Sequence, residues 1–199
     1  MKAVWEFSQG EHLPADNKGV CMQLVAYWVS MMGSEKAEMN ESSKKMEVLC
    51  KQEARKLQRA YEKVGKDASI KNDEAVTWAL RGLKLSKGGY TNCANAGSIV
   101  DYLDEKRRGY SMGIFFQGGG GHALGIWRSG KSSGLFKGLS GHSYFFDPNA
   151  GCYKGNTSGF ASWLTGFLAR TYPSCNAMNI AKVEGLTARA HWGGAFRMV

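Results

Sequence analysis

The sequence predicts an α+β fold, with helices in the first part of the chain and an antiparallel sheet in the second. Apolar residues recur at helical spacing over much of residues 21–107. From residue 109 onwards, short runs rich in aromatic and β-branched residues alternate with glycine and serine clusters, which is typical of strands. No internal repeat or low-complexity linker interrupts this order, so we expect residues 1–199 to form one domain, helical to about residue 108.

The size and composition of the chain exclude several classes of protein. At 199 residues and 43% apolar residues, it can build one hydrophobic core but hardly two. It contains no apolar run of about eighteen residues and no apolar block at its start, so we expect neither a membrane-spanning helix nor a cleaved signal peptide. Five widely spaced cysteines without a Cys-x-x-Cys pair argue against a disulfide framework and a zinc ribbon, and favour a reducing compartment.

The chain is basic, with 26 Lys and Arg against 17 Asp and Glu and a net charge of +9. A charge of this size can attract the protein to anionic membranes or acidic partners. Residues 44–63 mix both signs, however, and this favours a solvated helix face as the place of most of the charge. The charge therefore allows association with a membrane surface, and we expect no nucleic acid partner.

A cysteine lies at the start of the first predicted helix. The helix runs over residues 21–33, where Gly33 can end it and where Asp16 or Asn17 can accept hydrogen bonds from its first amides. Its apolar stripe consists of Cys21, Leu24, Val25, Trp28 and Met32. The pattern therefore places Cys21 in the first turn.

The remaining elements follow from the same two periodicities. Further helices are predicted over residues 34–64, with a break around 40–43, and over 73–85, 95–107 and 157–170. Strands are predicted over residues 110–116, 121–127 and 142–147, and near 177–183.

Cys21 is a candidate nucleophile because of its predicted place. The positive end of a helix and its free amides favour a thiolate, which is the reactive form of cysteine. The alternative is that Cys21 is a small buried apolar residue, which is common for free cysteine. A neighbouring base would decide between the two.

Of the four histidines, His122 has the most informative context. It follows the glycines 118–121 and begins the apolar run GHALGIW, so its ring is expected at a strand edge beside an accessible loop. His12, His142 and His191 lie in segments typical of surface or packing histidines. His122 is therefore the expected general base.

Asp147 supplies a third candidate group. In FFDPNAG it ends an aromatic strand, and Pro148 stops that strand, so the carboxylate can reach a histidine on an adjacent strand. Such a carboxylate would orient the imidazole and stabilise its cation. The alternative is an Asp-Pro-Asn turn in which Asp147 accepts a main-chain hydrogen bond. Together the three residues have the order and type of a cysteine-protease-like triad.

Three segments carry a resemblance to a known family: GVCMQLVAYWV at 19–29, GGHALGIW at 120–127 and YFFDPNAGCY at 144–153. They resemble the YopT/AvrPphB-like cysteine proteases, bacterial type III effectors of papain-like fold. The resemblance implies Cys21 as nucleophile, His122 as base and Asp147 as orienter. It also implies that the cysteine lies on a central helix packed on the C-terminal antiparallel sheet, and that the protein is delivered to the cytoplasm of a host or target cell.

The expected function is that of a cysteine endopeptidase without a metal or organic cofactor. Oxyanion donors would be the main-chain amide of Cys21 and the side chain of Asn17, although Asn17 could instead only cap the helix and Gln9 or Gln23 could donate. The expected partners are a protein substrate, a membrane surface, and an inhibitor or immunity protein. One alternative is another thiol acyl-transfer enzyme, such as a peptidoglycan amidase, a transglutaminase or a deamidase. A second is a non-catalytic basic binding module with Cys21 in its core.

Overall fold

One antiparallel sheet forms the centre of the molecule. The computed structural model describes residues 1–13, 20–33, 42–51, 85–103, 107–129 and 141–185. Within these residues, eight strands make a sheet whose main path has the order β1-β7-β6-β5-β4-β8-β2, and β3 also pairs with β8. The strands are β1 Lys2–Trp5, β2 Ser86–Lys87, β3 Thr91–Cys93, β4 Arg108–Phe116, β5 Gly121–Arg128, β6 His142–Asp147, β7 Gly151–Asn156 and β8 Cys175–Glu184.

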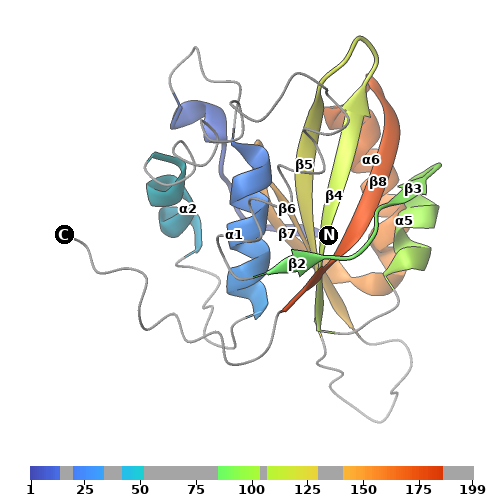
Figure 1. Ribbon diagram of the computed structural model, residues 1–199, viewed down its shortest axis with the longest axis horizontal. Coiled ribbons are helices and arrows are strands. Elements are labelled where there is room, and N and C mark those ends of the chain that lie inside the picture. The colour runs from blue at the N-terminus through green and yellow to red at the C-terminus, as the bar shows by residue number, and fades with distance from the viewer. Residues whose placement is uncertain (14–19, 34–41, 52–84, 104–106, 130–140, 186–199) are drawn as a thin grey trace.

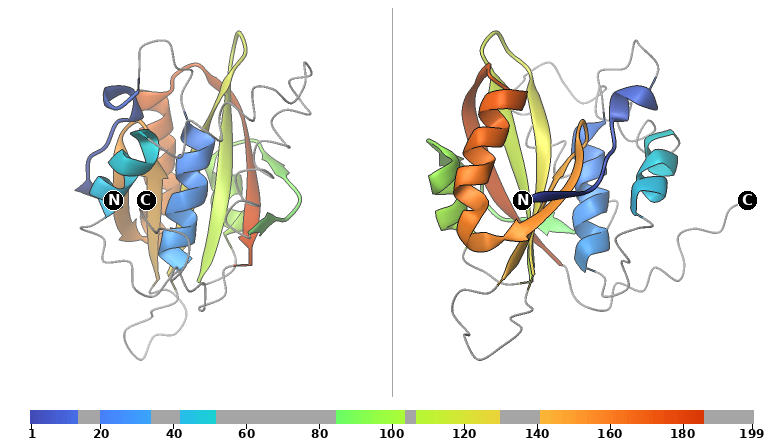
Figure 2. Two further views of the ribbon diagram at one scale, coloured as in Figure 1. Left: turned by 60° about the vertical axis from the view of Figure 1, so that its left-hand side comes forward. Right: turned by 180° about the vertical axis from the view of Figure 1, so that it is seen from behind.

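Helices cover both faces of this sheet (Figures 1 and 2). Helix α1 (Cys21–Gly33) lies on one face, and α2 (Ser42–Lys51) packs outside it. The other face carries α5 (Ala96–Tyr102) and α6 (Phe160–Thr171), as the view from behind shows. Short 3-10 turns precede α1 and α6, namely η1 (Gln9–Glu11) and η3 (Thr157–Gly159). The sheet therefore separates two hydrophobic clusters.

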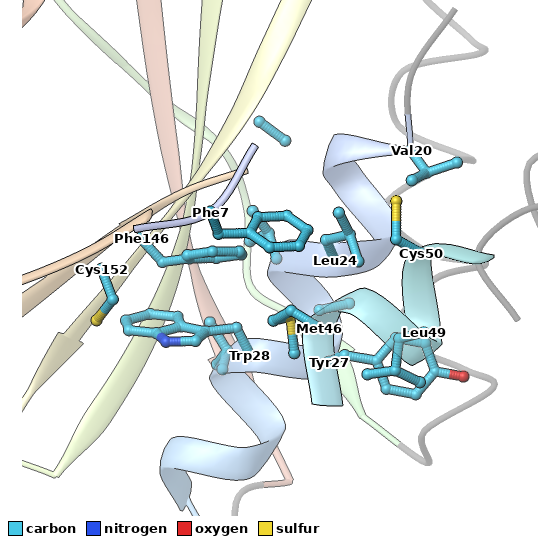
Figure 3. Packing of buried hydrophobic residues seen from close by; sticks show 14 of the residues in the cluster. Phe7, Val20, Leu24, Tyr27, Trp28, Met46, Leu49, Cys50, Phe146 and Cys152 are labelled. Carbon is cyan, nitrogen blue, oxygen red and sulfur yellow. The ribbon is translucent and has the colours of Figure 1, made fainter. Parts of the chain in front are cut away.

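The hydrophobic cluster between α1 and the sheet determines the distance between this helix and β5. Trp28 is buried and stacks on Phe146 of β6, with ring centroids 5.4 Å apart (Figure 3). A Cβ atom at Gly125 of β5 would lie 2.7 Å from a ring carbon of Trp28. Glycine at this position therefore lets the helix approach the strand closely.

On the opposite face, α6 packs an aromatic cluster against β6. Phe145 lies with its ring centroid 5.2 Å from those of both Trp163 and Phe167, in edge-on arrangements. Such edge-to-face contacts add to the free energy of apolar burial. The contacts hold α6 against β6, the strand that ends at Asp147.

The glycine run 118–121 forms the hairpin between β4 and β5. Gly118, Gly119 and Gly120 have φ angles of 95°, 97° and 84°, which residues with a side chain rarely adopt. The hairpin is closed by a hydrogen bond from the Phe116 amide to the Gly120 carbonyl, 3.2 Å long. The glycines are therefore needed for the turn that starts β5.

Several predicted elements are confirmed. The helix over residues 21–33 is α1, with Cys21 as its first residue, and the predicted strands correspond to β4, β5, β6 and β8. The predicted helix over 157–170 is η3 followed by α6. The mixed α+β class is thus correct.

Other predictions need correction or lie outside the described residues. The helix expected over residues 95–107 ends at Tyr102, and Arg107 has a φ of 54° in the turn before β4. The sheet is not confined to the chain after residue 109, because β1, β2 and β3 precede it. Of the helix expected over 34–64 only α2 is described, and that over 73–85 lies outside the described residues apart from Leu85, which is not helical.

Candidate active site

Cys21 is the first residue of α1, and the residue as a whole is half-buried. The helix is anchored there by the Leu24 amide, which donates to the Val20 carbonyl over 3.0 Å. The main-chain amides of Met22 and Ala123 help to lower the pKa of the thiol. The thiol therefore lies between the positive end of a helix and an amide of β5.

His122 lies on β5 at a point where the sheet opens. Gly121 to Leu124 pair with β4 only, because the pairing of β5 with β6 ends at Gly125 and Phe146. His122 is opposite Ile114, which belongs to the cluster under α6, whereas Cys21 packs against the cluster under α1. Residues that lie opposite each other on paired strands point to the same face of the sheet, so the His122 side chain starts on the face of Ile114. Cys21 approaches from the other face. The two side chains meet at the edge of β5 that β6 leaves free.

Asp147 holds the imidazole from the end of β6. Its Oδ1 lies 2.8 Å from Nε2 of His122, and both side chains are buried, with 0% and 6% of their surface exposed. The Asn149 amide donates to the same Oδ1 over 2.8 Å, and the Tyr172 hydroxyl donates to Oδ2 over 2.7 Å. Asp147 is therefore both the histidine partner and the turn acceptor that the sequence offered as alternatives.

The electrostatics of Cys21 and His122 are coupled. Burial by itself raises the pKa of a thiol, but the hydrogen bond and charge of His122 and the two amides lower the pKa of Cys21 below its ordinary value. Burial by itself lowers the pKa of an imidazole, but hydrogen bonds to Asp147 and Cys21 raise the pKa of His122 to about 10. The arrangement favours a thiolate beside an imidazolium.

Three other thiols have the opposite character. Burial raises the pKa of Cys93 and Cys175, and it raises the pKa of Cys152 to about 12. A free thiol without a cationic neighbour is poorly ionised at neutral pH. The low pKa of Cys21 is thus a property of its site, and not of cysteines in this fold.

The proposed oxyanion residues are placed only in part. Asn17 lies outside the described residues. Gln9 is buried, accepts the Val20 amide on Oε1 over 2.8 Å, and donates from Nε2 to Asn149 Oδ1 over 2.8 Å. Gln23 is buried as well, and its Nε2 has no hydrogen-bond partner among the described residues. Of the two alternatives, Gln9 directly contacts the residue that precedes Cys21.

The other histidines do not join this group within the described residues. His12 stacks on Phe7, with ring centroids 5.3 Å apart, and His142 is exposed at the start of β6. His191 lies outside the described residues. His12 thus has the packing position, and His142 the surface position, that we expected from the sequence.

Two polar residues of the site carry little or no sequence signal. The Asp-Pro-Asn run predicts the main-chain bond of Asn149 to Asp147, but not that its side chain meets Gln9. Tyr172 follows the end of α6, where apolar periodicity predicts only packing. Both contacts depend on the tertiary fold.

Neither a metal site nor a membrane span is found in the part of the chain that the structure describes. No three His, Cys, Asp or Glu side chains are grouped as a metal site there. None of the described helices has the length and apolar composition that spanning a bilayer requires.

Comparison with known proteins gives a similarity of fold. No family model matches the sequence, and neither does any curated protein. The structure is similar to the crystal structure of the avirulence protein AvrPphB of Pseudomonas, with a TM-score of 0.62 and 14% sequence identity. The match covers 88% of this chain and 99% of that one. This chain therefore has a mixed fold of helices and antiparallel sheet that resembles the fold of AvrPphB.

Proposed function

We propose that this protein is a cysteine endopeptidase with Cys21 as nucleophile, His122 as general base and acid, and Asp147 as the residue that orients the imidazole. The observation that carries the proposal is the contact of His122 Nε2 with the buried Asp147 carboxylate at 2.8 Å, beside a Cys21 whose pKa is lowered by His122. Nucleophile, base and orienter in contact are what covalent catalysis of acyl transfer requires.

The chemistry follows from this order. The Cys21 thiolate attacks the carbonyl carbon of a peptide bond, and the His122 imidazolium gives its proton to the leaving amine. His122, now neutral, takes a proton from water, which attacks the thioester and releases the second product. Asp147 stabilises the imidazolium without itself taking the proton.

The oxyanion that forms during attack needs two donors. The main-chain amide of Cys21 is the first in this proposal. Asn17 is the second donor that we proposed from the sequence, and Gln9 is the candidate among the described residues. A carboxamide carries two N–H groups, so Nε2 of Gln9 keeps one donor besides the bond to Asn149.

The biological role is also a proposal. AvrPphB is one of the two proteins after which the family that the sequence resembles is named, and the similarity of fold supports a related hydrolase. On this basis the protein is a secreted virulence effector or toxin that cuts a protein in the cytoplasm of a host or target cell. Its positive charge of +9 would favour encounter with an anionic membrane surface or an acidic partner.

The test offers two substrate classes to the purified protein. Wild type, Cys21→Ala and Cys175→Ala are each incubated with a denatured protein mixture and with muropeptides, and new termini are identified by mass spectrometry. We expect new protein termini with wild type and with Cys175→Ala, and none with Cys21→Ala. Cys175 is the matched control because it is also partly exposed but has a raised pKa.

The same experiment separates an endopeptidase from a peptidoglycan amidase. Cleavage of wall peptides alone, again lost in Cys21→Ala, would replace the endopeptidase with a peptidoglycan amidase. Equal cleavage of proteins by wild type and Cys21→Ala would contradict the proposal altogether.

A further inference from the structure

We infer that Tyr172 is a positioning residue of the proposed triad: its hydroxyl fixes the rotamer of Asp147 while its ring covers His122. The inference rests on the proposed function, because a positioning role has meaning only if Cys21 and His122 form a reactive pair. Within the proposed triad, Tyr172 contacts Asp147 through its hydroxyl and His122 through its ring, and we infer that its effect on the thiol passes through these two residues.

The hydroxyl of Tyr172 satisfies the outer oxygen of the carboxylate. It donates to Asp147 Oδ2 over 2.7 Å, whereas Oδ1 faces His122 Nε2 and the Asn149 amide. Asp147 has no exposed surface, so water cannot replace this donor without rearrangement. A buried carboxylate oxygen that loses its donor is costly. The bond from Tyr172 therefore favours the charged carboxylate in the rotamer that reaches the histidine.

A directed chain of hydrogen bonds orients that hydroxyl. The Val20 main-chain amide can only donate, so Oε1 of Gln9 must face it over 2.8 Å and Nε2 must face Asn149. Oδ1 of Asn149 accepts that bond, which leaves its Nδ2 to donate to the Tyr172 hydroxyl over 3.4 Å. The hydroxyl accepts there, and so its own proton points to Asp147.

The ring of Tyr172 completes the enclosure of the imidazole. Its centroid lies 5.3 Å from that of His122, with 40° between the planes. Phe116 and Phe167 pack against the same ring at 5.9 Å and 6.4 Å. The position is fixed by the main chain as well, because the Tyr172 amide caps α6 by donating to the Leu168 carbonyl over 2.8 Å. Both ring and hydroxyl are therefore held in place independently of Asp147.

The charged and titratable groups around the pair are known for the described residues. Cys21 and Asp147 act on His122, and the charges of both also act on Tyr172. Tyr153 is affected by the charge of Asp147 and, more weakly, by those of Glu6 and Cys152. Burial, together with these negative charges, raises the pKa of both tyrosines, so their hydroxyls stay protonated at neutral pH. Tyr172 thus remains a donor over the pH range in which the thiolate forms.

The test measures alkylation of Cys21 by iodoacetamide against pH, which requires no substrate. In Tyr172→Phe the ring stays and the donor is lost, so the Asp147 carboxylate is no longer held in the rotamer that stabilises the imidazolium. We expect the acid limb of the alkylation profile to move to higher pH, with a rate about tenfold lower on that limb. The matched control is Tyr153→Phe. In wild type the Tyr153 hydroxyl donates over 3.3 Å to the Ala150 carbonyl, in the turn that follows Asp147, so the alkylation profile of this variant should follow wild type.

Other outcomes would contradict either the role of Tyr172 or the proposed function on which it rests. A Tyr172→Phe profile that coincides with wild type, while His122→Ala abolishes reactivity near neutral pH, would overturn the role of Tyr172 alone. If His122→Ala leaves wild-type reactivity unchanged, the proposed function itself fails. Should Tyr172→Phe prove unfolded by circular dichroism, Asn149→Ala takes its place: it releases the hydroxyl from its orienting donor and should move the limb the same way by a smaller amount.

Discussion

The side-chain amides of Gln9 and Asn149 lie 2.8 Å apart, although 140 positions separate the two residues in the chain. The main chains are joined at the same place, where the Gln9 amide donates to the Pro148 carbonyl over 2.7 Å. The N-terminal segment is thereby fixed to the turn that follows Asp147. Residues before α1 therefore contribute to the geometry of a site whose base and orienter come from the second half of the chain.

Gln9→Ala should destabilise the protein. The substitution leaves the buried Val20 amide without its acceptor, and an unsatisfied buried group costs roughly 1–3 kcal/mol. The measurement is the free energy of unfolding in urea. Gln117→Ala, at an exposed glutamine, is the control and should change little. Equal stabilities for the two variants would mean that the Gln9 contacts contribute nothing net.

Ionisation of Cys21 should define the pH dependence of its reactivity. The pKa of Cys21 is lowered, so the thiolate forms at lower pH than that of an ordinary cysteine and is lost as the pH falls through that lowered value. The pKa of His122 is raised to about 10, so the imidazolium is lost as the pH rises through that value. Cleavage should therefore be fastest between these limits. Measured rates of peptide cleavage that rise only above the ordinary cysteine pKa of about 8.5 would exclude the ion pair.

Asp147→Asn should reduce turnover far more than it reduces stability. An amide cannot stabilise the imidazolium, and its NH₂ group would oppose the donors from Tyr172 or Asn149. We expect the cleavage rate to fall by about 100-fold or more, by analogy with the loss of an orienting carboxylate in serine proteases. The control is Asp101→Asn on the exposed surface of α5, which should retain wild-type rates. A turnover rate of Asp147→Asn near wild type would show that the carboxylate is only a turn acceptor.

Gly125→Ala should weaken the docking of α1. Its Cβ would lie 2.7 Å and 2.9 Å from ring carbons of Trp28, so the helix or the ring must shift. Overpacking of this kind costs about 1–3 kcal/mol, measured as a lower midpoint of urea unfolding. Gly89→Ala is the control, since a Cβ atom there would meet no described atom within 4 Å. Because α1 carries Cys21, iodoacetamide should also alkylate Cys21 more slowly near neutral pH in Gly125→Ala than in wild type.

The elements around the site could be predicted where each carries its own pattern. Cys21 to Gly33 repeats apolar residues at helical spacing, and GHALGIW and HSYFFD are short apolar runs bounded by turn residues. The strands that sequence reasoning missed lack such a pattern. In β7, for example, Cys152 is fully buried while Lys154 is exposed and glycines lie on both sides, so its pairing with β6 and β1 decides its conformation.

The triad candidates were recognisable, but the groups that hold them were not. His122 stood out through its glycine context, although the glycines serve the hairpin turn and not the histidine. Tyr172 and Gln9 gain their places from contacts across 25 and 140 positions of sequence. Local propensity carries no information about such contacts, because they exist only after the sheet and α6 have assembled.

Because α1 carries Cys21 while His122 and the Ala123 amide belong to β5, the full lowering of the pKa of Cys21 requires that helix and sheet have come together. A partly assembled chain would carry an ordinary, unreactive thiol at that position. The rate at which Cys21 becomes reactive during refolding would thus report the step at which α1 docks beside β5.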